Sequence, residues 1–324
     1  MTTSNFCFAT CQHGAERALK DEVAREHPDL NPAFQRPGLV TFKSASPIGP
    51  GQRLRSVFAR RQGIAVGPLA GNAIPKEALV QVFSRDPAPF EIAEAAWAAA
   101  RAHALAEGQR LGGSARAARV GELVADVITA PEEPTFLGLH MQRPDDAPLP
   151  GGEWPVEPMA DAPNLAWKKL EETLLWSGAP IRAGQQVLQI GCAPGGASLA
   201  LLRQGLNITG VDPAQMDQRV LNNRRFTWIQ SEINEVAEGL PERLDWLVVD
   251  AAMTPQRLIR SVRRFGPRYK RSLQGAILHF KLTDWRFADQ LPGFMADVAD
   301  LGFSRVRAAQ LASHRGEVVV YARR

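Results

Sequence analysis

The stretch best suited to chemistry is a glycine-rich turn between two apolar segments. Residues 187–190 read Val-Leu-Gln-Ile, and Gly-Cys-Ala-Pro-Gly-Gly follows at 191–196. This pattern predicts a strand, a tight loop and a helix start. Gly191, Gly195 and Gly196 would let backbone N–H groups approach a ligand at the helix N-terminus. The loop is therefore a candidate site for a nucleotide-like cofactor, although a structural turn would give the same pattern.

Two residues of this loop argue against a dinucleotide. The dinucleotide fingerprint has glycine at its third position, where this loop has Ala193. The next residue, Pro194, stiffens the turn and lacks a backbone donor. A pyrophosphate cradle is disfavoured, and a nicotinamide-dependent dehydrogenase is a distant alternative.

Four charged residues are predicted to meet at one rim of a sheet. Asp250 and Lys281 end apolar runs, and Glu317 begins the last one. The carboxyl ends of parallel strands share one edge, where an antiparallel last strand begins. Lys169 lies off the apolar stripe of a predicted helix. Taken one at a time, each has a simpler explanation: Asp250 could cap the next helix, the lysines could be solvated, and Glu317 could protect an edge strand from pairing with another chain. Together they favour a functional site.

The loop and the four charged residues resemble those of FtsJ-like ribose 2′-O-methyltransferases. In these enzymes a G-x-A-P-G-G loop opens the S-adenosylmethionine site, and a Lys-Asp-Lys-Glu tetrad is catalytic. The resemblance implies that Lys281 is the centre that removes the hydroxyl proton. It also implies that Asp250 and Glu317 orient Lys281, and that Lys169 lowers its pKa. The four groups should titrate as one unit.

A closer resemblance is to the ribosomal RNA large subunit methyltransferase M family, which methylates a cytidine 2′-hydroxyl of 23S rRNA. We expect this resemblance to extend over nearly the whole chain. The matching pieces are residues 169–172, the 191–196 loop, Asp250, Lys281-Leu282 and the tail 317–324. The chain departs from the family at Asn164-Leu165, where Ser-Arg is frequent, and at Ala197, where Trp is frequent.

The resemblance implies S-adenosylmethionine as cofactor and S-adenosylhomocysteine as product. Asp212 ends a predicted strand, where a carboxylate can take ribose hydroxyls. Glu232 stands where the family has an acid near the adenine, but it could equally cap a following helix. The expected cofactor-binding residues are Gly191, Ala193, Pro194, Gly195, Gly196, Asp212, Glu232 and Asp250.

A basic stretch follows Asp250. No acidic residue occurs before Asp284, and a helix from Pro255 would carry arginines opposite its apolar face. A merely soluble face usually mixes charge signs, so a phosphate-binding strip beside the rim is favoured over a solvated face. Tyr269 could add base stacking. The expected RNA-binding residues are Arg257, Arg260, Arg263, Arg264, Arg268, Lys270 and Arg271.

Composition sets broader limits. The 324 residues are 45% hydrophobic with a net charge of +4, which suits two or three globular domains. The three cysteines cannot form a disulfide framework, and Cys7, Cys11 and His13 lack a fourth ligand, so we expect no metal. Neither a leader nor a membrane-spanning run is recognisable, so we expect a cytoplasmic monomer with no membrane partner.

The predicted fold is α/β in two halves. Residues 1–74 would form an N-terminal α/β (ferredoxin-like) subdomain, including a helix around residues 53–61 whose arginines could be solvated or contact RNA. By the resemblance, residues 75–143 would be a THUMP-like RNA-binding subdomain, with a helix over 89–108. A proline-rich linker, 144–162, would precede a methyltransferase domain at 163–324.

The expected C-terminal domain is a Rossmann-like sheet of seven strands, with helices separating the first six and the last strand antiparallel. Its strands are predicted at 186–190, 208–211, 227–229, 246–249, 276–280, 304–308 and 317–321. RNA is the expected partner, either 23S rRNA or a large-subunit precursor. The alternatives are a catalytically silent RNA-binding or ribosome assembly factor, and a 2′-O-methyltransferase acting on another RNA.

Overall fold

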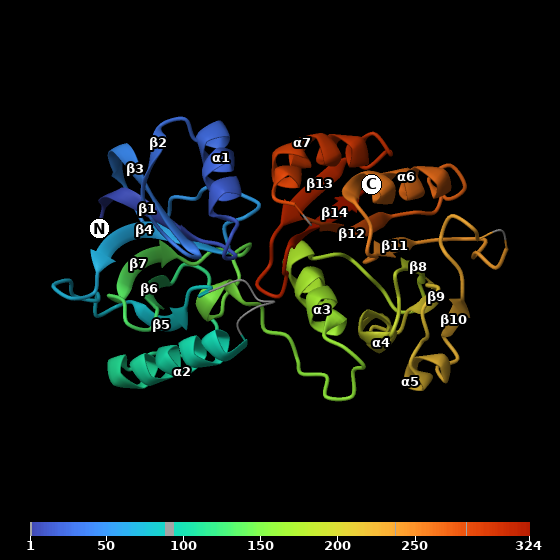
Figure 1. Ribbon diagram of the computed structural model, residues 1–324, viewed down its shortest axis with the longest axis horizontal. Helices are drawn as coiled ribbons and strands as arrows, with labels where there is room; N and C mark the ends of the chain where they lie inside the picture. The colour runs from blue at the N-terminus through green and yellow to red at the C-terminus, as the bar shows by residue number, and fades with distance from the viewer. Residues whose placement is uncertain (1, 88–93, 237, 283) are drawn as a thin grey trace. The chain divides into compact units, whose positions relative to one another are not determined.

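A computed structural model describes residues 2–87, 94–236, 238–282 and 284–324 (Figure 1). The chain divides into two compact units, Met1–Pro155 and Val156–Arg324. Each unit contains a seven-stranded sheet. The division between the units lies inside the predicted linker, residues 144–162.

Among its described residues, the N-terminal unit has a mixed sheet, two α-helices and one short 3₁₀ helix, η2 (Pro150–Gly152). Its strands run in the order β2-β3-β1-β4-β7-β6-β5, and β5 pairs with β6 in parallel. The elements are β1 (Ser4–Thr10), α1 (Glu16–Glu26), β2 (Leu30–Arg36), β3 (Leu39–Ile48), β4 (Arg61–Pro68), β5 (Leu79–Ser84), α2 (Glu94–Leu111), β6 (Leu123–Thr129) and β7 (Phe136–Met141). The predicted start of the second helix, at Pro89, lies outside the described residues.

The helix predicted around residues 53–61 is wrong. This segment is irregular, because the carboxylate of Glu22 on α1 accepts hydrogen bonds from the backbone N–H groups of Val57 and Phe58. The segment leads into β4. Arg61 is buried and pairs with Asp126 at 3.3 Å, so it is not a solvated or RNA-facing arginine.

The predicted boundary between residues 74 and 75 falls between β4 and β5, which are members of one sheet. By their contacts, residues 1–155 form a single compact unit. Contacts alone therefore do not separate a ferredoxin-like from a THUMP-like subdomain within this unit. The division into these two subdomains stays a prediction.

The C-terminal unit has the seven predicted strands. They run in the order β10-β9-β8-β11-β12-β14-β13. The elements are α3 (Ala166–Ser177), β8 (Gln186–Ile190), α4 (Gly196–Arg203), β9 (Asn207–Val211), α5 (Gln218–Leu221), β10 (Phe226–Ile229), β11 (Trp246–Val249), α6 (Pro255–Phe265), β12 (Gly275–Lys281), α7 (Arg286–Ala299), β13 (Arg305–Ala309) and β14 (Glu317–Arg323). The last strand, β14, is antiparallel to both of its neighbours, as the sequence predicts.

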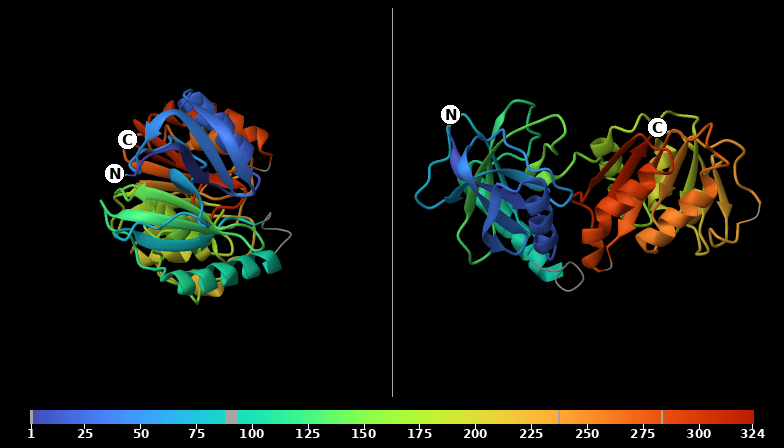
Figure 2. Two further views of the ribbon diagram at one scale, coloured as in Figure 1. Left: turned by 90° about the vertical axis from the view of Figure 1, so that its left-hand side faces the viewer. Right: turned by 90° about the horizontal axis from the view of Figure 1, so that it is seen from above.

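Helices cover both faces of this second sheet (Figures 1 and 2). Alternate side chains of a strand point to opposite faces. Val248 and Ile277 belong to the core that also contains Trp167 of α3 and Leu201 of α4. On the other face, Phe280 packs edge-on against Phe294 of α7, with ring centroids 6.0 Å apart.

One predicted helix of this unit is missing. Between β10 and β11, the described residues 230–236 and 238–245 contain turns and no helix. The apolar residues of this segment, such as Ile233 and Val236, are nevertheless buried. A turn can bury isolated apolar side chains without a helical repeat, so their spacing is a poor guide here.

Candidate active site

Three of the four predicted site residues lie at one end of the C-terminal sheet. Asp250 directly follows β11, Lys281 ends β12 and Glu317 begins β14. Lys281 and Glu317 are direct cross-strand partners in the antiparallel pair. The backbone N–H of Asp250 donates to Ile190 O at 2.9 Å, which fixes it beside the end of β8. The rim predicted from strand order is therefore present.

Lys169 of α3 completes a closed ring of ion pairs with these three residues. Its Nζ lies 2.8 Å from Asp250 Oδ2 and 3.0 Å from Glu317 Oε1. Lys281 Nζ lies 2.6 Å from Asp250 Oδ1 and also contacts Glu317 Oε2. Each ammonium group is thus held between two carboxylates, and each carboxylate between two ammonium groups. We call these four residues the ring.

The ring is mostly buried, so its members influence one another strongly. The Glu317 side chain is 4% exposed and the Lys281 side chain 23% exposed. Burial acts to raise the pKa of Asp250, but His279, Lys281 and Lys169 outweigh it and hold this pKa well below its usual range. Burial acts to lower the pKa of Lys281, but Asp250 and Glu317 outweigh it and raise this pKa.

The raised pKa of Lys281 corrects the expectation that Lys169 would lower it. The sequence places a second lysine near Lys281, but it does not show that two carboxylates contact both ammonium groups. Lys281 therefore carries its full complement of protons in this arrangement. Two of its three N–H groups are engaged by Asp250 and Glu317, and the third has no acceptor within the part of the chain that the structure describes, so it can donate to a further oxygen.

The glycine loop adjoins the ring through close backbone packing. Gly191 has φ +78°, and a Cβ there would lie 2.4 Å from Asp250 O. A Cβ on Gly196 would lie 2.0 Å from Asn164 Oδ1. The glycines at these two positions are thus explained by contacts within the chain: Gly191 packs against the residues after β11, and Gly196 packs against Asn164, just before α3. The sequence suggested that these glycines give a ligand access to the backbone. In the structure, close packing within the chain already requires glycine at both positions.

Asp212 organises the outer side of the loop. Its Oδ2 accepts the N–H of Ala193 at 2.9 Å, and its Oδ1 accepts the N–H of Ala214 at 2.8 Å. A carboxylate has about four acceptor positions, so further donors can still bind. The residue is half-buried at the end of β9. It can therefore bind hydroxyl groups at the mouth of the loop while holding the loop in place.

Glu232 lies in the turn after β10, and its side chain is exposed. The alternative that it caps a following helix is wrong, because residues 233–235 form a turn and no helix begins there. Its role toward a cofactor stays a prediction.

The basic stretch forms the predicted amphipathic helix, α6. Thr254 caps the helix by accepting the N–H of Arg257. Leu258, Ile259, Val262 and Phe265 are buried. The seven basic residues predicted to bind RNA are all exposed, namely Arg257, Arg260, Arg263, Arg264, Arg268, Lys270 and Arg271.

Only the first part of this strip adjoins the ring. The helix begins beside the end of β11, and the turn after it leads to the start of β12, where Lys270 O accepts Arg324 Nη1. A seven-residue strand such as β12 spans about 20 Å, so Lys270 and Arg271 lie far from Lys281. Tyr269 is buried, with its hydroxyl donating to Pro241 O at 2.7 Å, so the stacking role suggested by the sequence is wrong.

Sequence reasoning assigned no role to buried polar groups beneath the ring. Glu172 of α3 is fully buried and accepts the N–H of Ser313 at 2.9 Å, which ties α3 to the loop before β14. His279 is buried two residues before Lys281. Residues two apart in a strand share a face, so the position of His279 two residues before Lys281 is the signal in the sequence that it lies on the same face as Lys281.

Among the helices that the structure describes, none has the length and apolar character needed to cross a membrane. The three cysteines are buried and unpaired by disulfides. Burial raises the pKa of the Cys7 thiol to about 12.

The chain is similar in sequence to curated proteins of one name. It is 30% identical over 167 residues to ribosomal RNA large subunit methyltransferase M of Methylococcus capsulatus, covering 50% of this chain and 45% of that protein. It is 31% identical over 124 residues to the protein of that name from Xylella fastidiosa strain M12, covering 35% of this chain and 34% of that protein. The chain thus spans less than half the length of these relatives, and the resemblance covers less of the chain than the sequence motifs suggested.

No family model matches the chain. Among solved structures, a Plasmodium falciparum protein described as a ribosomal RNA methyltransferase has a TM-score of 0.38 and 17% identity, covering 49% of this chain and 96% of that one. Aeropyrum pernix fibrillarin, solved with S-adenosyl-L-methionine, has a TM-score of 0.33 and 18% identity, covering 44% of this chain and 68% of that one. Likenesses of this extent do not identify a function. By sequence, the chain resembles the ribosomal RNA large subunit methyltransferase M proteins over as much as half of its length.

Proposed function

We propose that this protein transfers the methyl group of S-adenosylmethionine to a ribose 2′-hydroxyl of RNA. The proposed substrate is a cytidine of 23S rRNA or of a large-subunit precursor. The observation that carries the proposal is the ring of Lys169, Asp250, Lys281 and Glu317, placed where the glycine loop packs against Asp250. The curated relatives carry names that agree with this chemistry.

The residues at the loop fit the proposed cofactor. Asp212 is anchored by two backbone N–H groups and keeps acceptor capacity for ribose hydroxyls. The loop from Gly191 to Gly196, with Ala193 and Pro194 inside it, leads into the N-terminus of α4. When bound, S-adenosylmethionine supplies an electrophilic methyl group attached to a sulfonium. We assign Asp212 to its ribose and Glu232 to its adenine.

The ring would position the accepting hydroxyl. Methyl transfer is an in-line displacement, so its rate depends on holding the ribose oxygen collinear with the methyl carbon. The unengaged N–H of Lys281 can donate to that oxygen and fix its direction. Asp250 and Glu317 hold Lys281 in place, and Lys169 holds both carboxylates. The hydroxyl proton must then move to an acceptor, because Lys281 is already fully protonated.

RNA binding is assigned to α6. Arg257 and Arg260 lie on the exposed face of α6 nearest the end of β11, where their guanidinium groups can bind phosphates. The other five basic residues would extend the positive surface along the unit. Binding at phosphates positions RNA without reading its sequence.

Calorimetry with S-adenosylmethionine and NADH, followed by single-turnover transfer, tests the proposal. The substrate is 23S rRNA from cells lacking this gene, and the transferred label should appear on a ribose. Binding of NADH without S-adenosylmethionine, or label on a base, would overturn the assignment. Cofactor binding without transfer to any large-subunit RNA would favour another RNA substrate or a silent assembly factor.

A further inference from the structure

His279 lies directly behind the ring. It belongs to β12 and faces the same side of the sheet as Lys281, two residues later. Its side chain is 1% exposed, and its Nδ1 has no hydrogen-bond partner among the residues that the structure describes. Leaving a buried polar atom unpaired is costly, so such an atom calls for an explanation.

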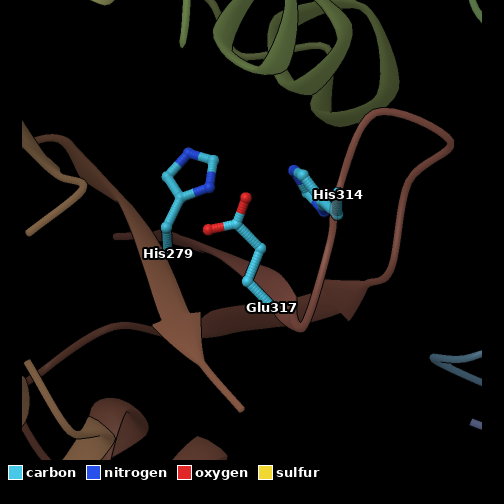
Figure 3. Close-up of side chains that lie close together, drawn as sticks. All are labelled: His279, His314 and Glu317. Atoms are coloured by element: carbon cyan, nitrogen blue, oxygen red, sulfur yellow. The ribbon is translucent and has the colours of Figure 1, made fainter. Parts of the chain in front are cut away.

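The charged groups around the His279 imidazole are two carboxylates and two ammonium groups, so their charges cancel. His279, His314 and Glu317 each place one nitrogen or oxygen atom within 4.8 Å of the others (Figure 3). The rings of His279 and His314 meet edge-on, with centroids 5.3 Å apart. The titratable groups around His279 are Lys169 from α3, Asp250 after β11, Lys281 from β12, Glu317 from β14 and His314 from the loop before β14.

Burial lowers the pKa of His279, against the opposite effect of Asp250 and Glu317. The imidazole is therefore neutral near pH 7 and keeps an acceptor nitrogen. If it gained a proton, both carboxylates would stabilise the charge. His279 lies within 4.8 Å of Glu317 and can gain a proton without breaking an ion pair.

We propose that His279 is a positioning residue that acts through Glu317 and takes up the proton released by methyl transfer. This inference rests on the proposed function. As the ribose oxygen bonds to the methyl carbon and the carbon–sulfur bond breaks, the hydroxyl proton passes to Lys281 Nζ in concert with the loss of another proton from this ammonium group, which is already fully protonated. Lys281 gives one of its protons to Glu317. Glu317 and His279, which lie within 4.8 Å of each other, then close to hydrogen-bonding distance, and Glu317 passes a proton to Nδ1 of His279. The products are a methyl ether, a neutral thioether and an imidazolium, which later loses its proton to water.

A metal ion at the same three side chains is less consistent with the contacts. Both oxygens of Glu317 already accept from ammonium groups, Oε1 from Lys169 and Oε2 from Lys281. A cation would have to displace these contacts next to two positive charges. The proton requires no such rearrangement.

The pH dependence of single-turnover methyl transfer tests the proposal. His279 must be neutral to accept, so the wild-type rate should fall with decreasing pH in a limb below about pH 6.5. His279→Asn cannot be protonated there, so it should lose this limb and transfer about 100-fold more slowly at pH 7.5. A uniform loss at every pH with the limb intact, or a rate within threefold of wild type, would overturn the proposal.

His314→Asn is the matched control, because it removes the neighbouring buried imidazole. It should keep the acidic limb, and loss of the limb in this variant alone would overturn the assignment to His279. Cofactor affinity of both variants, measured by calorimetry, should stay within about twofold of wild type, since neither residue is assigned to the cofactor.

Nitrogen NMR of the wild-type protein gives a test that needs no variant to be active. The His279 signals, identified by their absence from the His279→Asn spectrum, should show an unprotonated Nδ1 at pH 7.5. A proton on Nδ1 or a charged ring at that pH would overturn the proposal. A wild-type protein that transfers no methyl group would instead refute the proposed function. The proton path through His279 would then be refuted as well, because it depends on that function.

Discussion

Lys281 is the residue on which the proposed chemistry depends most directly. Its replacement by alanine removes the donor to the ribose oxygen and leaves Asp250 and Glu317 facing each other with Lys169 alone. We expect Lys281→Ala to reduce single-turnover methyl transfer at least about 1,000-fold, because positioning and proton transfer are lost together. Cofactor affinity should change only a few-fold, since Lys281 is assigned to the hydroxyl.

Lys168→Ala is a suitable control for Lys281→Ala, because it removes a lysine next to Lys169 that is outside the ring. Its transfer rate should stay near wild type. Labelled-cofactor transfer in one turnover measures both variants, and near wild-type turnover of Lys281→Ala would remove Lys281 from the mechanism.

Asp212 should have the opposite profile. In Asp212→Asn one oxygen is kept for the loop, but the charge that strengthens hydrogen bonds to ribose hydroxyls is lost. A hydrogen bond to a charged group is worth about 1.5–3 kcal/mol, so the cofactor dissociation constant should rise about 10- to 100-fold. Calorimetry measures this, with the exposed Asp300→Asn as control. An unchanged constant in Asp212→Asn would show that the ribose lies elsewhere.

How far the sequence predicts the site depends on the kind of property. The convergence of Asp250, Lys281 and Glu317 follows from strand order alone, since the ends of parallel strands share an edge. The pKa of Lys281 does not follow, because it depends on which carboxylates contact the ammonium and on burial. The burial of Tyr269 has the same cause, since a tyrosine after a helix reads as a loop residue until its packing is known.

At the scale of elements, regular periodicity was a good guide and irregular packing was not. Each predicted strand of the second sheet is present because its apolar run is bounded by polar or glycine residues. The segment 53–61 has helix-like spacing, but Glu22, distant in sequence, binds its backbone N–H groups. Such a tertiary contact overrides a local preference and leaves no trace in the local pattern.

The basic residues of α6 and those of the turn that follows it form two groups that should behave differently. Arg257 and Arg260 lie toward the ring, whereas Lys270 and Arg271 lie near the start of β12. If all contact phosphates, neutralising either pair to Gln should lower the slope of log affinity against log salt by roughly 0.7–0.9 per residue. The pair near the ring should also slow transfer at saturating RNA, because it positions the ribose.

Binding titrations over a range of salt concentrations measure this prediction for Arg257→Gln/Arg260→Gln and for Lys270→Gln/Arg271→Gln. The loss should be similar for 23S rRNA and unrelated RNA. An unchanged slope in a double variant would make that part of the basic stretch a solvated face. Loss confined to 23S rRNA would mean that these side chains read bases or RNA shape.

At the scale of the whole molecule, the ring distinguishes an enzyme from a silent binding factor. The N-terminal unit, residues 1–155, is compact by itself and contains residues 75–143, which the family resemblance predicts to bind RNA. A factor that only binds RNA would need its two units but not an intact ring. Full-length Lys281→Ala keeps both units and lacks only one member of the ring, so it separates these functions in cells.

We therefore expect deletion of the gene to remove ribose methylation at one cytidine of 23S rRNA. The wild-type chain should restore this methylation, and Lys281→Ala should not, although it should still associate with the RNA because α6 and the N-terminal unit are unchanged. Mapping of 2′-O-methyl groups across 23S rRNA from the three strains measures this. If the map were the same in all three strains, and Lys281→Ala corrected a defect in large-subunit assembly, the protein would be an assembly factor, and the ring would stabilise the fold without catalysing transfer.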